Sequence, residues 1–469
     1  MKRTVLINIV GLSQRLLDNR LPFLTRYFKN HQGKSILPAF PAVTTTAQYN
    51  YLTGKKPGAH GIVGNGWYDR TDAEIKFWKQ SNHLVQAPKI WEELKRKNPN
   101  IKVANLFWWY NMYSDVDIAV TPRPNYLADG RKFPDIYTMP KNLRNQLQDE
   151  LGTFPLFHFW GPKTSIKSSQ WIADCAKKVE LNHQPDLSLV YLPHLDYGLQ
   201  KYGPDHPKMK AELLAIDQLC QDLFTFFENR GLRIIALSEY GITPVNKSIA
   251  INRHLRLNGW LETRMEKGQE LLDPGASKAF AVADHQVAHL YIKKTEYLAD
   301  LKNELMLLDG VEKVMDKKEQ EKAGLCHERS GDLLLVANAN AWFNYYYWFD
   351  DKKAPLFAKT VDIHRKPGYD PVELFMDSSP LTPIKVAGKL LAKKLGFRTL
   401  LNVIPINETL VKGSHGRIPE SKNDWPVLFS NDESLEINDH LESTDVFGLL
   451  QKAFALNSPT TVPEQINNL

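Results

Sequence analysis

The chain has 469 residues, of which 43% are hydrophobic, so it can bury a large core and is expected to form one main domain with an insertion. Its formal net charge is +6, and no dense Lys/Arg block is interleaved with aromatic residues, so a nucleic-acid partner is not indicated. No apolar run approaches the length of a membrane span. Three scattered cysteines without a CxxC pair predict a reduced, cytoplasmic protein, and none of these properties fixes the oligomeric state.

The predicted elements alternate between strands and helices. Thr4–Val10 reads as a first strand, too short for a signal sequence, and a helix over residues 16–24 follows it. A buried strand is predicted at Leu187–Leu192, a helix over 213–227, and a further strand at Leu232–Leu237. This alternation indicates an α/β fold with a largely parallel sheet.

Polar residues follow or lie near the ends of three of these strands. They are Asn8 in the first strand, Asp196 shortly after the second, and Glu239 shortly after the third. Ligands of open α/β sheets bind beyond the carboxyl ends of the strands, so this edge is the expected site.

The pattern changes after the third of these strands, and four regions are predicted. Residues 1–241 form the first part of the core, 242–359 an inserted cap, 360–456 a return to the core, and 457–469 a polar, mobile tail.

Thr44 lies in the segment Pro41–Thr46, just before a helix-like run that ends at Gly54. A lone threonine in this position would ordinarily be a helix N-cap. A threonine at a helix N-terminus also brings backbone N–H groups near an anion, and becomes a useful nucleophile when a metal or a base lowers its pKa.

Four segments occur along the chain in the order Pro41–Thr46, His60–Asn65, Asp196–Pro204 and Gly413–Gly416. Together they resemble the nucleotide pyrophosphatases/phosphodiesterases and phosphonoacetate hydrolases of the alkaline phosphatase superfamily. The resemblance implies a three-layer α/β sandwich with a mostly parallel central sheet and an inserted cap. It also implies that Thr44 is the nucleophile, that Asn65 holds a phosphoryl oxygen, and that Asp196 and His415 bind metal.

Other positions depart from the pattern of that superfamily. Its first strand ends in Asp-Gly where this chain has Val10-Gly11, and Asn8, two residues earlier, offers only a neutral carbonyl oxygen. Gln200 stands at a histidine position, and Glu239-Tyr240 replaces Asp-His. The resemblance implies zinc, but this set of ligands is weaker for zinc and leaves magnesium, manganese or no metal open.

Further titratable residues could rebuild the site, although a structural role is favoured for each. The set is His194, Asp284, His285, His289, the pair Asp362/His364 and the run His327–Asp332. Among them, Asp284, His285 and His289 are the strongest candidates. Two aromatic blocks, Phe107–Tyr110 and Trp342–Trp348, are interpreted as strand segments that line a pocket or pack at the interface with the cap.

The leading hypothesis is a metal-dependent hydrolase of phosphodiester or phosphoanhydride bonds in a small molecule, acting through a phosphorylated Thr44. Asp196, His415 and Glu239 would hold the metal, with Gln200, Tyr240 and Asn8 as weak ligands or supports. One alternative is a relative that has lost hydrolysis and binds a phosphorylated or prenylated metabolite or a partner protein. A third hypothesis is a phosphonate hydrolase or a phosphate-group transferase with the same fold.

Overall fold

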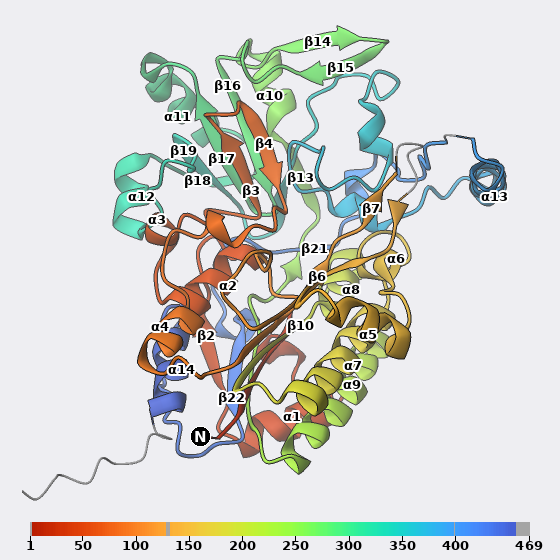
Figure 1. Ribbon diagram of the computed structural model, residues 1–469. Helices are drawn as coiled ribbons and strands as arrows, with labels where there is room; N and C mark the ends of the chain where they lie inside the picture. Colours follow the sequence, from red (N-terminus) through yellow and green to blue (C-terminus); the bar gives the residue numbers. More distant parts are fainter. Residues whose placement is uncertain (1, 128–131, 398, 456–469) are drawn as a thin grey trace, which may run out of the picture.

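The main feature of the computed structural model, which describes residues 2–127, 132–397 and 399–455, is a nine-stranded sheet (Figure 1). The predicted mobile tail at 457–469 lies outside the described residues. The order across the sheet is β23 (Leu441–Glu442), β2 (Lys34–Leu37), β22 (Val427–Ser430), β11 (Arg233–Leu237), β1 (Thr4–Ile9), β10 (Leu187–Leu192), β5 (Val103–Leu106), β6 (Ile118–Pro122) and β9 (Ile136–Met139).

The centre of this sheet is parallel, which confirms the predicted fold class. Strands β11, β1, β10, β5 and β6 pair in parallel, whereas β22, β2 and β9 join by antiparallel pairing. Asn8 lies beside Tyr191 of β10 and Leu237 of β11. Since parallel strands end at one edge, the segments that follow β10 and β11 meet beyond Asn8.

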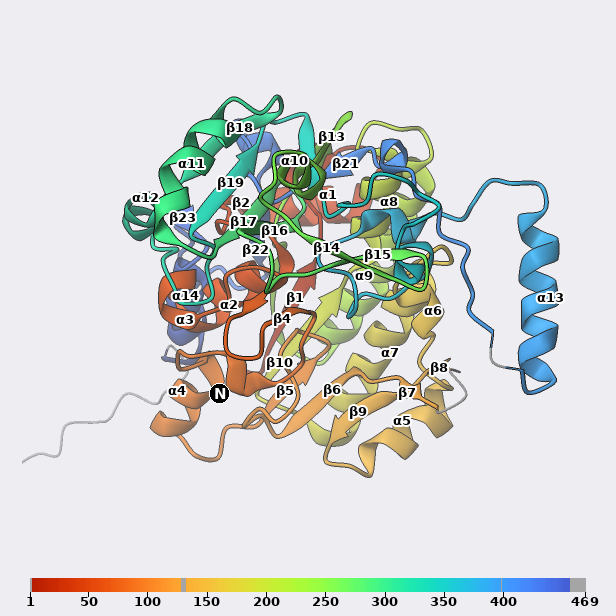
Figure 2. The same ribbon diagram turned by 90° about the horizontal axis from the view of Figure 1, so that it is seen from above.

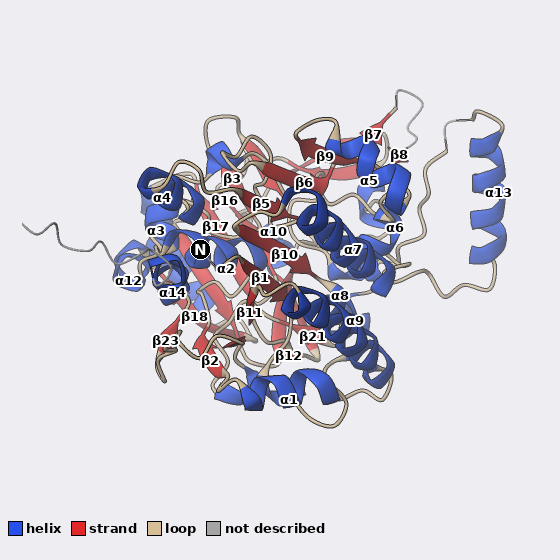
Figure 3. Ribbon diagram, turned by 60° about the horizontal axis from the view of Figure 1, so that its bottom comes forward, coloured by secondary structure: helices blue, strands red, loops and turns tan. Residues whose placement is uncertain are grey.

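Helices cover both faces of the sheet (Figure 3). One face carries α1 (Pro22–Asn30), α7 (Ile166–His183) and α9 (Met209–Asn229), and the other carries α2 (Thr44–Thr53), α4 (Ile90–Lys97) and α14 (Asp445–Ala455). The helix predicted over residues 16–24 is wrong in part. Residues 14–16 form a 3-10 turn and the α-helix begins at Pro22, because proline suits the first helical turn and not the interior.

A second, smaller sheet lies above the first in Figure 1, within the stretch predicted to be inserted. Its order is β16 (Ala279–Asp284), β17 (Val287–Ile292), β19 (Leu333–Ala337) and β18 (Val311–Met315), and all its pairs are antiparallel. The turn between β16 and β17 reaches the edge of the main sheet, where the Gln286 N–H donates to the His415 carbonyl at 2.8 Å.

Short elements complete the structure. The remaining α-helices are α3 (Pro57–His60), α5 (Leu143–Leu151), α6 (Leu156–Phe159), α8 (His194–Tyr202), α10 (Ile251–Leu257), α11 (Leu298–Met306), α12 (Lys317–Ala323) and α13 (Thr382–Lys394). The remaining strands are β3 (Gly66–Asp69), β4 (Glu74–Phe77), β7 (Asn125–Tyr126), β8 (Lys132–Phe133), β12 (Thr243–Pro244), β13 (Lys247–Ala250), β14 (Thr263–Glu266), β15 (Gln269–Leu272), β20 (Ala341–Asn344) and β21 (Gly413–Ser414).

The aromatic block Phe107–Tyr110 is not a strand. It forms a buried loop directly after β5, and Phe107 and Tyr110 take positive φ values of 73° and 52°. Such values are incompatible with an extended chain, so the strand interpretation of this block is wrong. The other block begins in β20 and is buried against the smaller sheet.

Two further sequence expectations concern cysteines and membranes. Cys175, Cys220 and Cys326 are all unpaired thiols. Among the described residues, no helix combines the length and apolar character that crossing a bilayer requires.

Candidate active site

Thr44 is the first residue of α2, at the carboxyl edge of the parallel strands. The preceding Val43 has an extended backbone (φ −126°, ψ 157°), so the chain turns into the helix at the predicted nucleophile. The Thr44 side chain is buried, and its Oγ1 lies 3.0 Å from the Tyr240 hydroxyl. Helix N-termini leave backbone N–H groups without intrahelical partners and attract anions.

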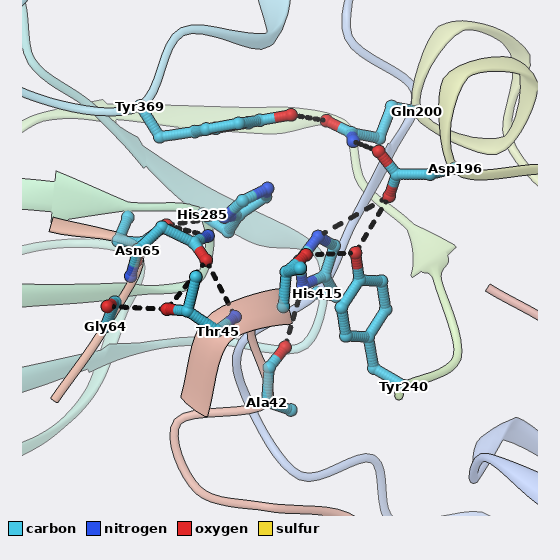
Figure 4. Close-up of polar contacts among 12 residues, drawn as sticks. Ala42, Thr45, Gly64, Asn65, Asp196, Gln200, Tyr240, His285, Tyr369 and His415 are labelled. Carbon is cyan, nitrogen blue, oxygen red and sulfur yellow. Dashed lines mark hydrogen bonds and ion pairs between the residues drawn. The ribbon is translucent and has the colours of Figure 1, made fainter. Parts of the chain in front are cut away.

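A chain of hydrogen bonds runs from Thr44 to Tyr369. Figure 4 shows its part from Tyr240 through Asp196 and Gln200 to Tyr369. The Tyr240 hydroxyl donates to Asp196 Oδ1 at 3.1 Å, so the Thr44 hydroxyl must donate to Tyr240. Gln200 Nε2 donates to Asp196 Oδ2 at 2.8 Å, and the Tyr369 hydroxyl donates to Gln200 Oε1 at 3.0 Å. Both carboxylate oxygens of Asp196 and both ends of the Gln200 amide are therefore engaged.

His415 is held by the loop that carries Thr44. Its Nδ1 donates to the Ala42 carbonyl at 2.7 Å, while the Ala42 N–H donates to the Gly416 carbonyl at 2.9 Å. Because a carbonyl can only accept, Nε2 of His415 carries the lone pair. This Nε2 is buried and has no hydrogen-bond partner among the described residues, and it lies 3.8 Å from Asp196 Oδ1.

Four rings stack in series across the site. Tyr240 lies on His415 with ring centroids 3.6 Å apart, His415 on His285 at 3.7 Å, and His285 on Tyr369 at 3.6 Å. The stack joins the main sheet to the turn of the smaller sheet (Figure 4). His285 takes a positive φ of 61° in that turn, an uncommon conformation that often marks a functional position.

Asp284 anchors Asn65 from the smaller sheet. The Asn65 N–H donates to Asp284 Oδ2 at 2.8 Å and Asn65 Nδ2 donates to Oδ1 at 3.1 Å. Asp284 Oδ1 also lies 2.8 Å from Nδ1 of His285. The side-chain oxygen Oδ1 of Asn65 accepts from the Thr45 N–H at 3.1 Å. Asn65 therefore fixes the first turn of α2, and both ends of its amide are occupied.

Glu239 is buried next to Thr44 and Asp196, and two amides hold one of its carboxylate oxygens. Its Oε1 accepts from Asn8 Nδ2 at 2.6 Å and from Gln48 Nε2 at 2.7 Å. The structure thus orients Asn8 as a donor toward Glu239, whereas the sequence suggested that its carbonyl would face a metal. Glu239 Oε2 and Asn8 Oδ1 are buried without partners among the described residues.

Burial governs the charges of this site. It raises the pKa of Asp196 to about 7, against the hydrogen bonds from Tyr240 and Gln200. Burial likewise raises the pKa of Glu239 to about 8, against Gln48 and Asn8. The pKa values of His285 and His415 fall well below the usual range because burial disfavours the imidazolium form. The imidazoles are therefore neutral at pH 7.

The residues present do not fit the paired-metal centre that the resemblance implies. Val10 is apolar, Gln200 and Tyr240 donate hydrogen bonds to Asp196, and Glu239 is turned toward Asn8 and Gln48. Within the part of the chain that the structure describes, no three His, Cys, Asp or Glu side chains form a group able to hold a metal ion. Asp196 Oδ1 and His415 Nε2 lie 3.8 Å apart, and a cation bound by this pair stays a prediction.

Of the further candidates, only Asp284 and His285 are found at the site. His289 bonds to the Val63 carbonyl at 3.0 Å and accepts from the Gly331 N–H, which is a structural role. His194 lies 2.9 Å from Glu212, and His327 lies 2.7 Å from Gln86. His364 lies 3.2 Å from the Phe77 carbonyl, and Asp362 forms an ion pair with Arg365.

Sequence reasoning missed Tyr369 and Gln48. Tyr369 stands after a Pro-Gly pair, and its side chain contributes both a ring to the stack and a hydrogen bond to Gln200. Gln48 is one turn after Thr44 on α2, so helical spacing was an available signal that it could face the same edge.

Comparison with known families matches most of this chain. The family model for type I phosphodiesterase / nucleotide pyrophosphatase matches residues 4–370. A pyrophosphatase/phosphodiesterase of Schizosaccharomyces pombe is 23% identical over 248 residues, 51% of this chain and 41% of that protein. Ectonucleotide pyrophosphatase/phosphodiesterase 2 of Saccharomyces cerevisiae is 24% identical over 270 residues, 52% and 48% of the two chains. The match spans less than half the length of these relatives.

Solved structures share the fold at low identity. Phosphonoacetate hydrolase of Sinorhizobium meliloti, in complex with phosphonoacetate, superposes with a TM-score of 0.62 and 15% identity over 96% of each chain. Murine ectonucleotide pyrophosphatase / phosphodiesterase 5 superposes with a TM-score of 0.57 and 14% identity, over 97% of this chain and 95% of that one. The alkaline phosphatase-like architecture is thereby established.

Proposed function

This chain belongs to the type I phosphodiesterase / nucleotide pyrophosphatase family, and we propose that it hydrolyses phosphodiester or phosphoanhydride bonds in a small molecule with Thr44 as the nucleophile. Hydrolysis of such bonds is the chemistry of the family. The observation that carries the proposal is the chain Thr44–Tyr240–Asp196, with oxygen–oxygen distances of 3.0 and 3.1 Å.

This chain of hydroxyls gives Thr44 a route for its proton. As Oγ1 forms a bond to phosphorus, its proton passes to the Tyr240 oxygen, and the Tyr240 proton passes to the Asp196 carboxylate. The bond from phosphorus to the leaving oxygen breaks, and that oxygen departs with the electron pair. Water then hydrolyses the phosphothreonine and restores the hydroxyl.

The N-terminus of α2 supplies partial positive charge for the phosphoryl group. Asn65 fixes this turn by accepting from the Thr45 N–H, and Asp284 holds Asn65 in turn. This route uses no metal ion, because the side chains present do not fit the expected pair of ions. Metal analysis tests whether Asp196 and His415 bind zinc, magnesium or manganese.

The test compares Thr44→Ala with Thr46→Ala, a buried threonine in the same turn whose hydroxyl donates to the Ile62 carbonyl. Wild-type protein is assayed on aryl phosphodiesters and dinucleoside polyphosphates, and quenched reactions are searched for phosphothreonine by mass spectrometry. Thr44→Ala is expected to lower kcat by at least about 10³-fold and to abolish the adduct. Full turnover by Thr44→Ala on every substrate cleaved by the wild type refutes the mechanism.

A second function is the binding of a phosphorylated metabolite without hydrolysis. It is favoured because polar side chains of the site form hydrogen bonds with one another. Asp196, Gln200 and Asn65 are occupied by neighbours, and among the described residues no Lys or Arg side chain bonds to any of the three. A ligand-induced rise in Tm without turnover would support binding alone. Metal analysis and chelator treatment of the same preparation then distinguish a metal-dependent hydrolase from a metal-independent hydrolase and from a protein that only binds its ligand.

A further inference from the structure

Helix α13 (Thr382–Lys394) stands away from the body of the protein at the end of two long connecting segments (Figures 1 and 2). Val386 packs against a small cluster that includes Trp342 and Val403. Other apolar side chains face solvent: Ile384 is 69% exposed, Leu391 59% and Leu395 67%. Large apolar side chains gathered in water mark an interaction surface.

The charge of this segment has one sign. Residues 378–407 contain no Asp or Glu, and their basic residues are Lys385, Lys389, Lys393, Lys394 and Arg398. Helical spacing places positions 384, 391 and 395 along one face, whereas lysines recur at every fourth position from 385 to 393 along another. A basic helix with a separate apolar face is typical of segments that lie on a membrane surface.

The apolar surface continues beyond the end of the helix. Phe397 is 66% exposed and Leu400 49% exposed, so an aromatic ring and a further leucine extend the same region. At thirteen residues the helix is too short to span a bilayer, and it can lie only in the plane of the interface. The segment also lies beyond residue 370, where the match to the family model ends.

We propose that α13, with Leu395 and Phe397 directly after it, docks this protein onto an anionic lipid surface. The apolar face would enter the boundary between headgroups and acyl chains, and the basic positions 385, 393 and 394 would supply positive charge at the headgroups. Lys389 is excluded from this set because its ammonium donates to the Leu400 carbonyl at 2.7 Å. Charge complementarity favours this partner. Residues 378–407 carry basic side chains and no acidic ones, so they would not repel anionic headgroups. The inference is independent of the chemistry at Thr44.

The full chain is tested by flotation with phosphatidylcholine vesicles, with and without about one third phosphatidylglycerol. Binding is expected to the anionic vesicles and to weaken as salt is raised. Leu391→Ser/Leu395→Ser is expected to lower the partition coefficient at least about tenfold through lost apolar burial. Lys385→Glu/Lys393→Glu is expected to lower it at least about 25-fold, at roughly fivefold for each basic residue removed.

The matched control is Leu257→Ser/Leu307→Ser, which removes two leucines that are 69% and 87% exposed in the smaller-sheet region. This variant is expected to float like the wild type. Equal flotation of the wild type and Leu391→Ser/Leu395→Ser overturns the proposal, as does failure of the wild type to bind anionic vesicles at low salt. Self-association that requires these leucines, measured by light scattering without vesicle binding, would instead assign the surface to a second copy and equally refutes it.

Discussion

The ring of Tyr240 lies flat on the imidazole of His415, with centroids 3.6 Å apart and planes inclined by 7°. This contact orients the Tyr240 hydroxyl between Thr44 and Asp196, at 3.0 and 3.1 Å. A phenol thus links the proposed nucleophile to the carboxylate that the family resemblance would assign to a metal. Where the resemblance implies a histidine ligand, this chain presents a hydroxyl that bridges Thr44 and Asp196.

Tyr240→Phe removes this hydroxyl and retains the ring. If it accepts the Thr44 proton, kcat is expected to fall by about 10²-fold or more with little change in KM. The free energy of unfolding should also fall by about 1–2 kcal/mol, because buried Asp196 loses one donor. Steady-state kinetics and urea unfolding measure the two effects.

Tyr369→Phe is the matched control for Tyr240→Phe. The Tyr369 hydroxyl donates to Gln200 and not to Thr44. Tyr369→Phe therefore removes a buried hydroxyl from the same network without affecting the contact to Thr44. A similar loss of stability with a much smaller loss of kcat is expected. If both variants retain the wild-type kcat, the proton route proposed through Tyr240 does not operate.

Restoring imidazoles should restore zinc binding. Gln200→His/Tyr240→His places two histidines beside Asp196 and His415, and His415 already has its Nδ1 fixed by the Ala42 carbonyl. An orienting bond of this kind prepares a histidine to bind metal through its other nitrogen. We expect zinc affinity to rise at least about 100-fold over wild type, measured by calorimetry and elemental analysis.

The control for zinc binding is Gln320→His in α12, which is far in sequence from the site. The buried Gln320 side chain donates to the Met315 and Gly331 carbonyls. It should leave zinc content at the wild-type level. An unchanged zinc affinity in Gln200→His/Tyr240→His would show that the surrounding side chains, and not the missing imidazoles, prevent metal binding.

Asp432 makes stability depend on acid pH. Although burial opposes ionisation, hydrogen bonds from Ser434 and the Arg233 guanidinium lower the pKa of Asp432 to about 2. The depressed pKa means that the stabilisation is complete above about pH 4 and is lost as the pH falls through about 2. Asp432→Asn is expected to cost about 2 kcal/mol at pH 7 and progressively less toward pH 2.

Unfolding curves at several pH values test the Asp432 prediction. Asp309→Asn serves as control, because that carboxylate is 91% exposed beside Lys247 and a surface pair contributes little. A cost for Asp432→Asn that is the same at pH 7 and at pH 2 would contradict the linkage.

The edge of the site could be predicted from the sequence because the alternation of strands and helices, which indicates a largely parallel sheet, is a local pattern. The strand Leu187–Leu192 forms as predicted. Asn8 lies near the carboxyl end of β1, and Asp196 and Glu239 follow the carboxyl ends of β10 and β11. Each of these residues lies within a few positions of an apolar strand, so its placement needed no long-range information.

The contacts made by those residues could not be predicted in the same way. An amide can present its nitrogen or its oxygen, and in Asn8 the nitrogen faces Glu239. His285 reaches the site because the turn between β16 and β17 packs against the segment of His415, which is a tertiary relationship between distant parts of the chain. The loop Phe107–Tyr110 was misread because aromatic composition favours strands, whereas its positive φ values leave no pattern in the sequence.

The pair Asn65 and Asp284 offers a charge-exchange test of the link between the smaller sheet and α2. Asn65→Asp would place two buried carboxyl groups about 3 Å apart, where one must stay protonated, and we expect a loss of about 2–4 kcal/mol at pH 7. Because the added carboxyl has a raised pKa, the loss should grow as the pH rises. The exchange Asn65→Asp/Asp284→Asn restores one amide and one carboxylate and should recover at least about half of that loss. Urea unfolding of the wild type, both single variants and the exchange gives the coupling energy. Additive costs would mean that this contact does not hold the smaller sheet to α2.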